Sequence, residues 1–212
     1  MKHEDNAHIY DLGMKLHWLG RYKAFRRSII RNFDSFENAC ILDYGCGTAL
    51  LLEFIKTNYR YQGDYFGIDP GLGMLKVASG KAIPHQSACF VQASSLPSFP
   101  IKSESVDVFV SSLVTHQISS EEKQLLFSEI LRVLKPGAKA VMAEFGRPTN
   151  IIGKMIAYYT KHVWGAAIPE IGANVAGNFE GIVPELFKAA GFSQFAITCR
   201  WKGIIDVMAG VK

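Results

Sequence analysis

The sequence predicts an α/β protein with a doubly wound, mostly parallel seven-stranded sheet that closes in a C-terminal antiparallel hairpin. From residue 39 onward, short apolar runs typical of strands alternate with helical runs, and repeated strand–helix units imply parallel strands with right-handed crossovers. Segment 105–114 is nearly all apolar, as expected of a strand covered on both faces. Only Lys202 and Gly203 separate the last two strand-like runs, which predicts the hairpin.

Turn signals bound the predicted elements. The strands are apolar runs that stop at a glycine or a polar turn, and we expect them at residues 39–45, 64–69, 88–93, 105–114, 138–145, 195–201 and 203–211. We expect helices at residues 51–59, 74–82, 119–134 and 184–190. We expect the helix at 119–134 to begin at Ser119 or Ser120, followed by Glu122 or Lys123. We expect Lys135-Pro136-Gly137 to end it.

The composition is that of one ordinary folded domain. Of the 212 residues, 49% are apolar and 20% are charged, which excludes a disordered or fibrous chain. No run of about 18 uncharged apolar residues occurs, so we expect no membrane-spanning helix. The N-terminus, MKHEDNAHIYDL, carries charge where a signal peptide has its apolar stretch, so we expect a cytoplasmic chain.

The cysteines predict neither a metal site nor a disulfide framework. They show no CxxC spacing and have apolar neighbours, a pattern that favours buried free thiols. The four residues are Cys40, Cys46, Cys89 and Cys199.

The net charge of +4 is local to the N-terminus. Residues 1–31 hold seven Lys or Arg against three acids, whereas residues 32–212 hold sixteen of each sign, so the chain lacks the overall bias of a nucleic-acid binder. Apolar residues recur at roughly helical spacing within residues 8–31. Two interpretations stay open: a surface helix with a solvated basic side, or a basic amphipathic face that contacts anionic lipid or an acidic substrate.

The turn after the first strand is the expected ligand site, because ligands of such sheets bind at the carboxyl ends of the strands. Gly45 and Gly47 allow backbone to approach a ligand, and the next helix presents free N–H groups. A dinucleotide fingerprint needs a third glycine where Leu50 stands. Asp43 would repel a pyrophosphate but suits a ligand with an ammonium and a sulfonium, and Asp69 can accept both hydroxyls of a ribose.

With these features in order, the chain resembles the class I S-adenosylmethionine-dependent methyltransferases. ILDYGCGTA is similar to the first motif of that family, GIDPGLGML to the second, VQASSLPSFPIKSESVDVFVSSL to the adenine-binding turn and fourth strand, and EILRVLKPGAKAVMAEF to the stretch that follows. The flanks, including HIYDLGMKLHWLGRYKAFRR and the closing KGIIDVMAGVK, are similar to the ubiquinone/menaquinone biosynthesis C-methyltransferases.

The resemblance implies S-adenosylmethionine as the cofactor, and residues that bind it. Asp43 would hold the methionine ammonium and Asp69 the ribose hydroxyls. Gln92, where an aspartate is usual, would accept from the adenine amine, and the Ala93 N–H would donate to a ring nitrogen. Ala49 replaces the last glycine of the first motif. Other residues would supply close backbone or pack against the cofactor, namely Gly45, Cys46, Gly47, Pro70, Met74 and Ser111.

The resemblance also divides the single domain into segments. A helical insertion that the quinone enzymes carry after residue 177 is largely missing, so we expect a more open acceptor cavity. The expected segments are an N-terminal helical lid at 1–35, a cofactor-binding core at 36–146, a substrate or lid region at 147–183, and a C-terminal helix and hairpin at 184–212.

Candidate catalytic residues are those expected near the transferred methyl group. His116, just past the fourth strand, and Tyr10, from the lid, are the two selected; His8, Glu144 and Arg147 are further candidates for a base. A base is needed only if the acceptor loses a proton. A structural role stays open for some of them, because His116 could cap the next helix and Glu144 could pair with Arg147.

The acceptor is expected to be hydrophobic, because the apolar, aromatic stretch 151–164 should wall its cavity together with Tyr10 and Leu12. We therefore expect a methyltransferase that acts on a small molecule such as a quinone precursor or a secondary metabolite. Peripheral membrane contact through residues 8–31 stays open, and no nucleic-acid partner is expected. Two alternatives remain: a phosphatidylethanolamine N-methyltransferase at the membrane surface, and a non-catalytic module that keeps the cofactor pocket.

Overall fold

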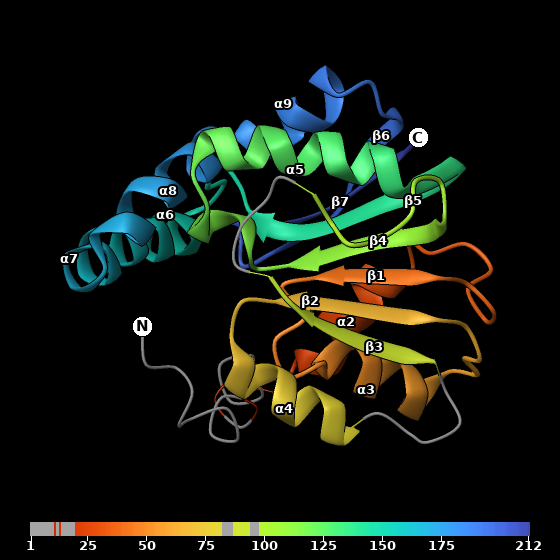
Figure 1. The fold of residues 1–212 in the computed structure, drawn as a ribbon. Coiled ribbons are helices and arrows are strands. Elements are labelled where there is room, and N and C mark those ends of the chain that lie inside the picture. Colours follow the sequence, from red (N-terminus) through yellow and green to blue (C-terminus); the bar gives the residue numbers. More distant parts are fainter. Residues whose placement is uncertain (1–10, 12, 14–19, 82–86, 94–97) are drawn as a thin grey trace.

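Seven strands form one sheet in the order β3-β2-β1-β4-β5-β7-β6 (Figure 1). The computed structural model describes residues 11, 13, 20–81, 87–93 and 98–212. Strands β1 to β5 pair in parallel, and β7 runs antiparallel to both β5 and β6, which confirms the predicted fold class. The strands are β1 (Ile41–Tyr44), β2 (Tyr65–Asp69), β3 (Ala88–Gln92), β4 (Val106–Ser112), β5 (Leu134–Phe145), β6 (Ser193–Trp201) and β7 (Ile205–Val211).

Helices cover both faces of the sheet (Figure 1). Because successive strand residues point to opposite faces, Ile41 and Leu42 lie in different cores. Ile41 packs in the cluster beneath α2 and α3, and Leu42 in the cluster beneath α5 and α9. The helices are α2 (Tyr22–Ile30), α3 (Leu50–Asn58) and α4 (Leu72–Lys81) on one face, with α5 (Ser120–Val133) and α9 (Ile182–Ala189) on the other.

The described part of the predicted N-terminal lid is a helix packed on the sheet. In α2, Phe25 and Ile29 are fully buried against the sheet and α3, and Arg26 is only 7% exposed. The apolar side of α2 faces the sheet while Lys23 and Arg27 are exposed, which agrees with the first interpretation, a surface helix with a solvated basic side. Lid movement and lipid contact of residues 8–31 stay predictions. Most of residues 8–19 lie outside the described residues.

The start of α5 confirms one prediction, and its end corrects another. Ser119 Oγ accepts from the Glu122 N–H at 3.2 Å, and the Glu122 carboxylate accepts from the Ser119 N–H at 2.7 Å, a reciprocal cap. Ser119 therefore caps this helix, and His116 does not. The segment Lys135-Pro136-Gly137 was expected to separate helix from strand, but β5 already begins at Leu134. Gly137 has a φ of +79°, which permits an irregular strand instead of a separate turn.

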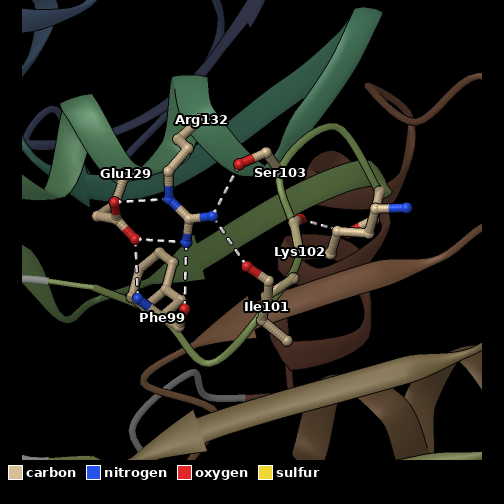
Figure 2. A network of polar contacts seen from close by, with 7 residues as sticks. Phe99, Ile101, Lys102, Ser103, Glu129 and Arg132 are labelled. Atoms are coloured by element: carbon tan, nitrogen blue, oxygen red, sulfur yellow. Dashed lines mark hydrogen bonds and ion pairs between the residues drawn. The ribbon is translucent and has the colours of Figure 1, made fainter.

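Arg132 ties the segment that leads into β4 to α5 (Figure 2). Its guanidinium donates to both carboxylate oxygens of Glu129 at 2.8 Å, and to the carbonyls of Phe99 at 3.1 Å and Ile101 at 2.9 Å. It also donates to the Ser103 hydroxyl at 3.1 Å, while Glu129 accepts from the Phe99 N–H at 2.8 Å. One side chain thus fixes several backbone groups of a segment without regular structure.

Beyond β5 a helical arm projects past the ends of the parallel strands (Figure 1). Gly165 and Gly172 cross within it, because a Cβ on Gly165 would lie only 2.9 Å from the Gly172 Cα. Only Gly181 separates the arm from α9, in agreement with the missing insertion. The arm comprises α6 (Ile151–Tyr159), the π-helical turn η3 (Thr160–Trp164), α7 (Gly165–Ala167) and α8 (Pro169–Glu180).

The cysteines are free thiols, but they are less buried than predicted. Cys46 is buried, Cys40 and Cys199 are half-buried, and Cys89 is exposed. Cys89 lies on β3, the edge strand of the sheet, which is incompletely covered. The prediction of four buried thiols is therefore wrong for three of them.

Candidate functional site

The turn between β1 and α3 has a backbone geometry that glycine favours. Gly45 has a φ of +73°, and a Cβ there would lie 2.2 Å from Cγ2 of Val114. The N–H groups of Gly45 and Cys46 donate to the Ile68 carbonyl at 2.8 and 3.1 Å, which fixes the turn against the end of β2. Ala49 has a φ of +56°, and this left-handed conformation explains why the resembled motif has glycine at that place.

Asp43, near the end of β1, is a buried carboxylate. Its exposed fraction is 3%, and the Tyr65 hydroxyl of β2 donates a hydrogen bond to it. Burial raises the pKa of Asp43 to about 6, while the Tyr65 hydrogen bond and the charge of Arg26 limit the rise. The carboxylate is therefore mostly ionised at pH 7, where a cationic ligand group would gain from its charge.

Arg26 joins α2 to this site, which the sequence did not reveal. Its Nη1 donates to the Ser112 hydroxyl at the end of β4 at 3.4 Å, and its Nε donates to the Tyr22 hydroxyl at 2.9 Å. The Arg26 guanidinium is buried and its charge acts on Asp43, so the site holds a positive and a negative side chain. Such a pair suits a zwitterionic ligand group.

Asp69 ends β2 and links two turns. Its Oδ2 accepts from the Gly47 N–H at 2.9 Å, and its Oδ1 accepts from the Gly71 N–H at 2.8 Å. Burial raises the pKa of Asp69, and these two hydrogen bonds oppose the rise. A carboxylate has about four acceptor sites, so Asp69 can still accept from two ligand hydroxyls.

The two residues predicted to meet the adenine lie beside Asp69, but one of them makes a different hydrogen bond from the one expected. Gln92 is exposed, and its amide nitrogen donates to the Pro70 carbonyl at 3.1 Å, which leaves the amide oxygen for a ligand amine. The Ala93 N–H, expected to donate to the adenine, instead donates to the Asp69 carbonyl at 3.3 Å. Met74 is half-buried, its Cγ 3.2 Å from where a Cβ on Gly71 would lie.

Ser111 supplies an unsatisfied polar group under the site. The residue is 2% exposed, and no described residue makes a hydrogen bond to its Oγ. A buried hydroxyl without a partner costs free energy, so such a group points to a missing ligand or water. Asp11, in the N-terminal segment, accepts from the Thr48 hydroxyl and pairs with Lys81 at 2.5 Å, so residue 11 lies against the first turn.

His116 and Glu144 form a buried pair at the ends of β4 and β5. His116 Nδ1 lies 2.9 Å from Glu144 Oε1, and the two residues are 5% and 1% exposed. Burial alone would raise the pKa of Glu144, but the His116 charge and hydrogen bonds from His116, Phe145 and Thr115 lower it below its usual value. The pairing of Glu144 with Arg147, left open by the sequence, does not occur in the structure, because Arg147 instead donates to the Glu180 carbonyl at 2.7 Å.

A buried lysine reinforces this pair, and sequence reasoning missed it. Lys123 is fully buried in α5, and its Nζ donates to the Asn174 carbonyl of α8 at 2.9 Å. Burial lowers the pKa of Lys123, and the nearby charge of Glu144 opposes this. Asn178 of α8 also donates to the Thr115 hydroxyl at 3.3 Å, so the arm and the loop of His116 are linked by polar contacts.

The predicted walls of the acceptor cavity stay predictions. Tyr10 and Leu12 lie outside the described residues. The stretch 151–164 follows β5 as expected, and six of its large apolar side chains are exposed, while Ile156 packs against the core. The ring packed against His116 is Phe145, 5.1 Å away between ring centroids, and Phe179 of α8 lies 5.7 Å from Phe145.

The comparisons with known proteins agree with this geometry. A family model described as "Methyltransferase domain" matches residues 42–142. The demethylmenaquinone methyltransferase of Streptomyces griseus is 31% identical over 176 residues, which cover 82% of this chain and 70% of that protein. The chain belongs to the class I S-adenosylmethionine-dependent methyltransferases, in the ubiquinone/menaquinone C-methyltransferase branch.

Two further comparisons cover nearly the whole methyltransferase chain. The demethylmenaquinone methyltransferase of Streptomyces avermitilis is 29% identical over 226 residues, which cover 99% of this chain and 92% of that protein. The solved complex of the Haloferax volcanii Trm112 methyltransferase activator with a methyltransferase matches with a TM-score of 0.70 and 18% identity, covering 99% of this chain and 97% of the solved one. At that identity the solved structure supports the fold alone.

The cofactor of this methyltransferase is S-adenosylmethionine, and the residues present fit it. The Asp43 carboxylate suits the methionine ammonium, and Asp69 has acceptor sites for a diol. The unpartnered Ser111 hydroxyl at the end of β4 gains a polar neighbour when a ligand lies over it. When bound, the cofactor supplies an electrophilic methyl group on a sulfonium.

Proposed function

We propose that this methyltransferase methylates a ring carbon of a hydrophobic, quinone-type aromatic acceptor, and that His116 removes the acceptor's hydroxyl proton. The observation that supports this most strongly is the buried His116–Glu144 pair. It lies at the carboxyl ends of β4 and β5, next to the strand ends that carry the cofactor residues. The printed names of the relatives, demethylmenaquinone methyltransferases, favour the same acceptor class.

The hydrogen bonds of His116 prepare it to accept a proton. Its Nδ1 faces the Glu144 carboxylate, so the neutral ring carries its lone pair on Nε2. The acceptor hydroxyl gives its proton to Nε2, and the resulting oxyanion makes the adjacent ring carbon electron-rich. Glu144, whose pKa is held low, stabilises the imidazolium. With a cofactor bound, that carbon would take the methyl group as the carbon–sulfur bond breaks and its electron pair stays on sulfur. The proton of the ring carbon would then pass to solvent, and the His116 imidazolium would return its proton to the acceptor oxygen, which restores the aromatic ring, the hydroxyl and the neutral histidine.

The cofactor residues would align the methyl group with that acceptor. Asp43 binds the methionine ammonium and Arg26 the methionine carboxylate, because their opposite charges lie side by side in the buried site. Asp69 binds the ribose hydroxyls, and the Gln92 amide oxygen accepts from the adenine amine. Holding both reactants in line is the main contribution of the protein, since the cofactor brings the reactivity.

The aromatic residues around His116 fit an uncharged ring. Phe145 packs edge-on against the imidazole, and Phe179 packs edge-on against Phe145. These side chains exclude water from the proton-transfer site, which strengthens the His116–Glu144 interaction.

Single-turnover methyl transfer to reduced demethylmenaquinone analogues tests the proposal. The wild type and His116→Gln are mixed with labelled cofactor and a short-chain acceptor, and product is followed over time. Loss of a general base should slow turnover by about 10²-fold or more without changing cofactor affinity. Equal rates for the two proteins would show that His116 takes no proton, and no transfer by the wild type would exclude this acceptor class.

A further inference from the structure

Helix α6 exposes an unusual amount of apolar surface. Ile151 is 70% exposed, Met155 66% and Tyr158 68%, whereas most large apolar side chains of the described residues are buried. Ile152, Tyr159 and Val163 continue the patch at 56%, 53% and 47%. We call these six residues the α6 patch. Single exposed apolar residues need no explanation, but a contiguous patch of this kind marks an interaction surface.

The α6 patch occupies one side of a helix whose other side is already packed. At 100° per residue, the exposed positions from Ile151 to Tyr159 lie within an arc of about 120°. Gly153 and Thr160 lie on the opposite side and are buried, and Ile156 packs against the core there. The exposed side is therefore a second apolar face, which none of the described residues covers.

The Lys, Arg, Asp and Glu residues within the segment that carries the α6 patch are of one sign. Residues 148–169 contain Lys154 and Lys161 and no aspartate or glutamate. Both lysines are exposed, and their spacing of seven residues puts them on the same flank of the patch. Such a flank repels a second copy of itself and attracts an anionic surface.

We propose that the α6 patch docks on the surface of an anionic lipid bilayer, with α6 lying in the plane of the interface. Ile151, Ile152 and Met155 enter the acyl boundary, Tyr158 and Tyr159 lie at the headgroup level, and the lysines meet lipid phosphates. Within the described residues no helix is long and apolar enough to cross a membrane. The α6 helix, about 14 Å long, fits an in-plane orientation.

Docking would also orient the active site. The helical arm lies beyond the ends of β4 and β5 (Figure 1), and α8 is bonded to the loop of His116 through Asn178 and Thr115. The carboxyl ends of the strands would then face the bilayer side of the molecule. The lipid contact itself does not depend on which acceptor is methylated.

Vesicle co-sedimentation tests the docking without any measurement of methyl transfer. The full chain is mixed with vesicles of equal parts phosphatidylglycerol and phosphatidylcholine, or of phosphatidylcholine alone. We expect binding to the anionic vesicles that the triple variant Ile151→Ser, Met155→Ser, Tyr158→Ser weakens by at least about tenfold. The matched control is Leu125→Ser with Ile197→Ser, which removes exposed apolar side chains elsewhere and should bind like the wild type.

A charge variant and the oligomeric state complete the test. Lys154→Gln with Lys161→Gln should weaken binding to anionic vesicles by about tenfold at low salt, and Lys102→Gln with Lys188→Gln should not. Equal sedimentation of the wild type and the triple variant would overturn the proposal. A dimer that the triple variant dissociates, without vesicle binding by the wild type, would assign the patch to a second copy and also overturn it.

Discussion

The Tyr65 hydroxyl donates a hydrogen bond to the Asp43 carboxylate, and both side chains are buried between neighbouring strands. Burial raises the pKa of Asp43 to about 6, with the Tyr65 hydrogen bond and the Arg26 charge holding the rise in check. Asp43 thus carries a charge at pH 7 in a place where that charge is costly. A cationic ligand group removes the cost, which links cofactor affinity to the ionisation of one residue.

Cofactor affinity should therefore fall as the pH falls through 6. The free enzyme has a raised Asp43 pKa, and the bound ammonium favours the ionised form, so binding releases a proton below pH 6. From a pKa of about 6, calorimetry should find S-adenosylmethionine bound about tenfold more weakly at pH 5 than at pH 7. The stability of the free protein changes in the opposite direction. Because folding raises the pKa of Asp43, the free energy of unfolding falls as the pH rises from the usual aspartate pKa to about 6. An affinity that is flat between these pH values would contradict the assignment of Asp43.

Tyr65→Phe should weaken cofactor binding by about 1–2 kcal/mol, because the buried Asp43 carboxylate loses its hydrogen-bond donor and its pKa rises further. Tyr61→Phe is the matched control. Its hydroxyl is also buried and donates to a backbone carbonyl, that of Asp64 at 2.7 Å, just before β2 and away from Asp69 at the end of that strand. Both variants should lose some stability, but only Tyr65→Phe should lose cofactor affinity. Equal affinities in the two variants would show that Asp43 does not contact the ligand.

Glu144→Gln should lower kcat by about 10²-fold, because the neutral amide no longer stabilises a protonated His116. The substitution keeps the size of the side chain and its acceptor for the Phe145 N–H, which donates at 2.8 Å. Cofactor affinity by calorimetry should stay unchanged. The pH profile of kcat should change as well, an effect that a purely structural role of Glu144 would not produce.

Arg132→Ala should destabilise the fold by about 2–3 kcal/mol, because it removes a charge-assisted pair with Glu129 and leaves two backbone carbonyls without a donor. For a chain of this size that corresponds to a fall in Tm of about 5–10 °C. Arg132→Lys keeps the charge but loses the bidentate geometry, so its Tm should lie between those of the wild type and Arg132→Ala. Thermal unfolding of the three proteins checks this, and an unchanged Tm in Arg132→Ala would show that the network in Figure 2 adds no stability.

Local patterns predicted the sheet and part of the cofactor site. Strand ends place acids at one edge of a parallel sheet, so Asp43 and Asp69 could be selected from their positions alone. The reciprocal cap of Ser119 and Glu122 could also be found, since both partners lie within one turn.

Contacts between distant segments could not be predicted in this way. Tyr65 and Asp43 are 22 residues apart, and His116 and Glu144 are 28 apart, so their pairing depends on strand register. Arg26 was only counted among the basic residues of the N-terminal segment, because helical spacing alone does not show which side of the helix meets the sheet. The apolar residues of α6 were expected to wall the acceptor cavity, and their exposure shows that no described segment covers them. Apolar periodicity identifies a face but not what covers it.

Methyl transfer to a ring carbon is tested by identifying the atom of the acceptor that receives the methyl group. Purified enzyme is incubated with S-adenosylmethionine that carries an isotope-labelled methyl group and with reduced demethylmenaquinone, and the product is examined by NMR and mass spectrometry. We expect the label to be bonded to a ring carbon, and we expect His116→Gln to form the same product far more slowly. Label on an oxygen, or no transfer by an enzyme that binds the cofactor, would contradict it.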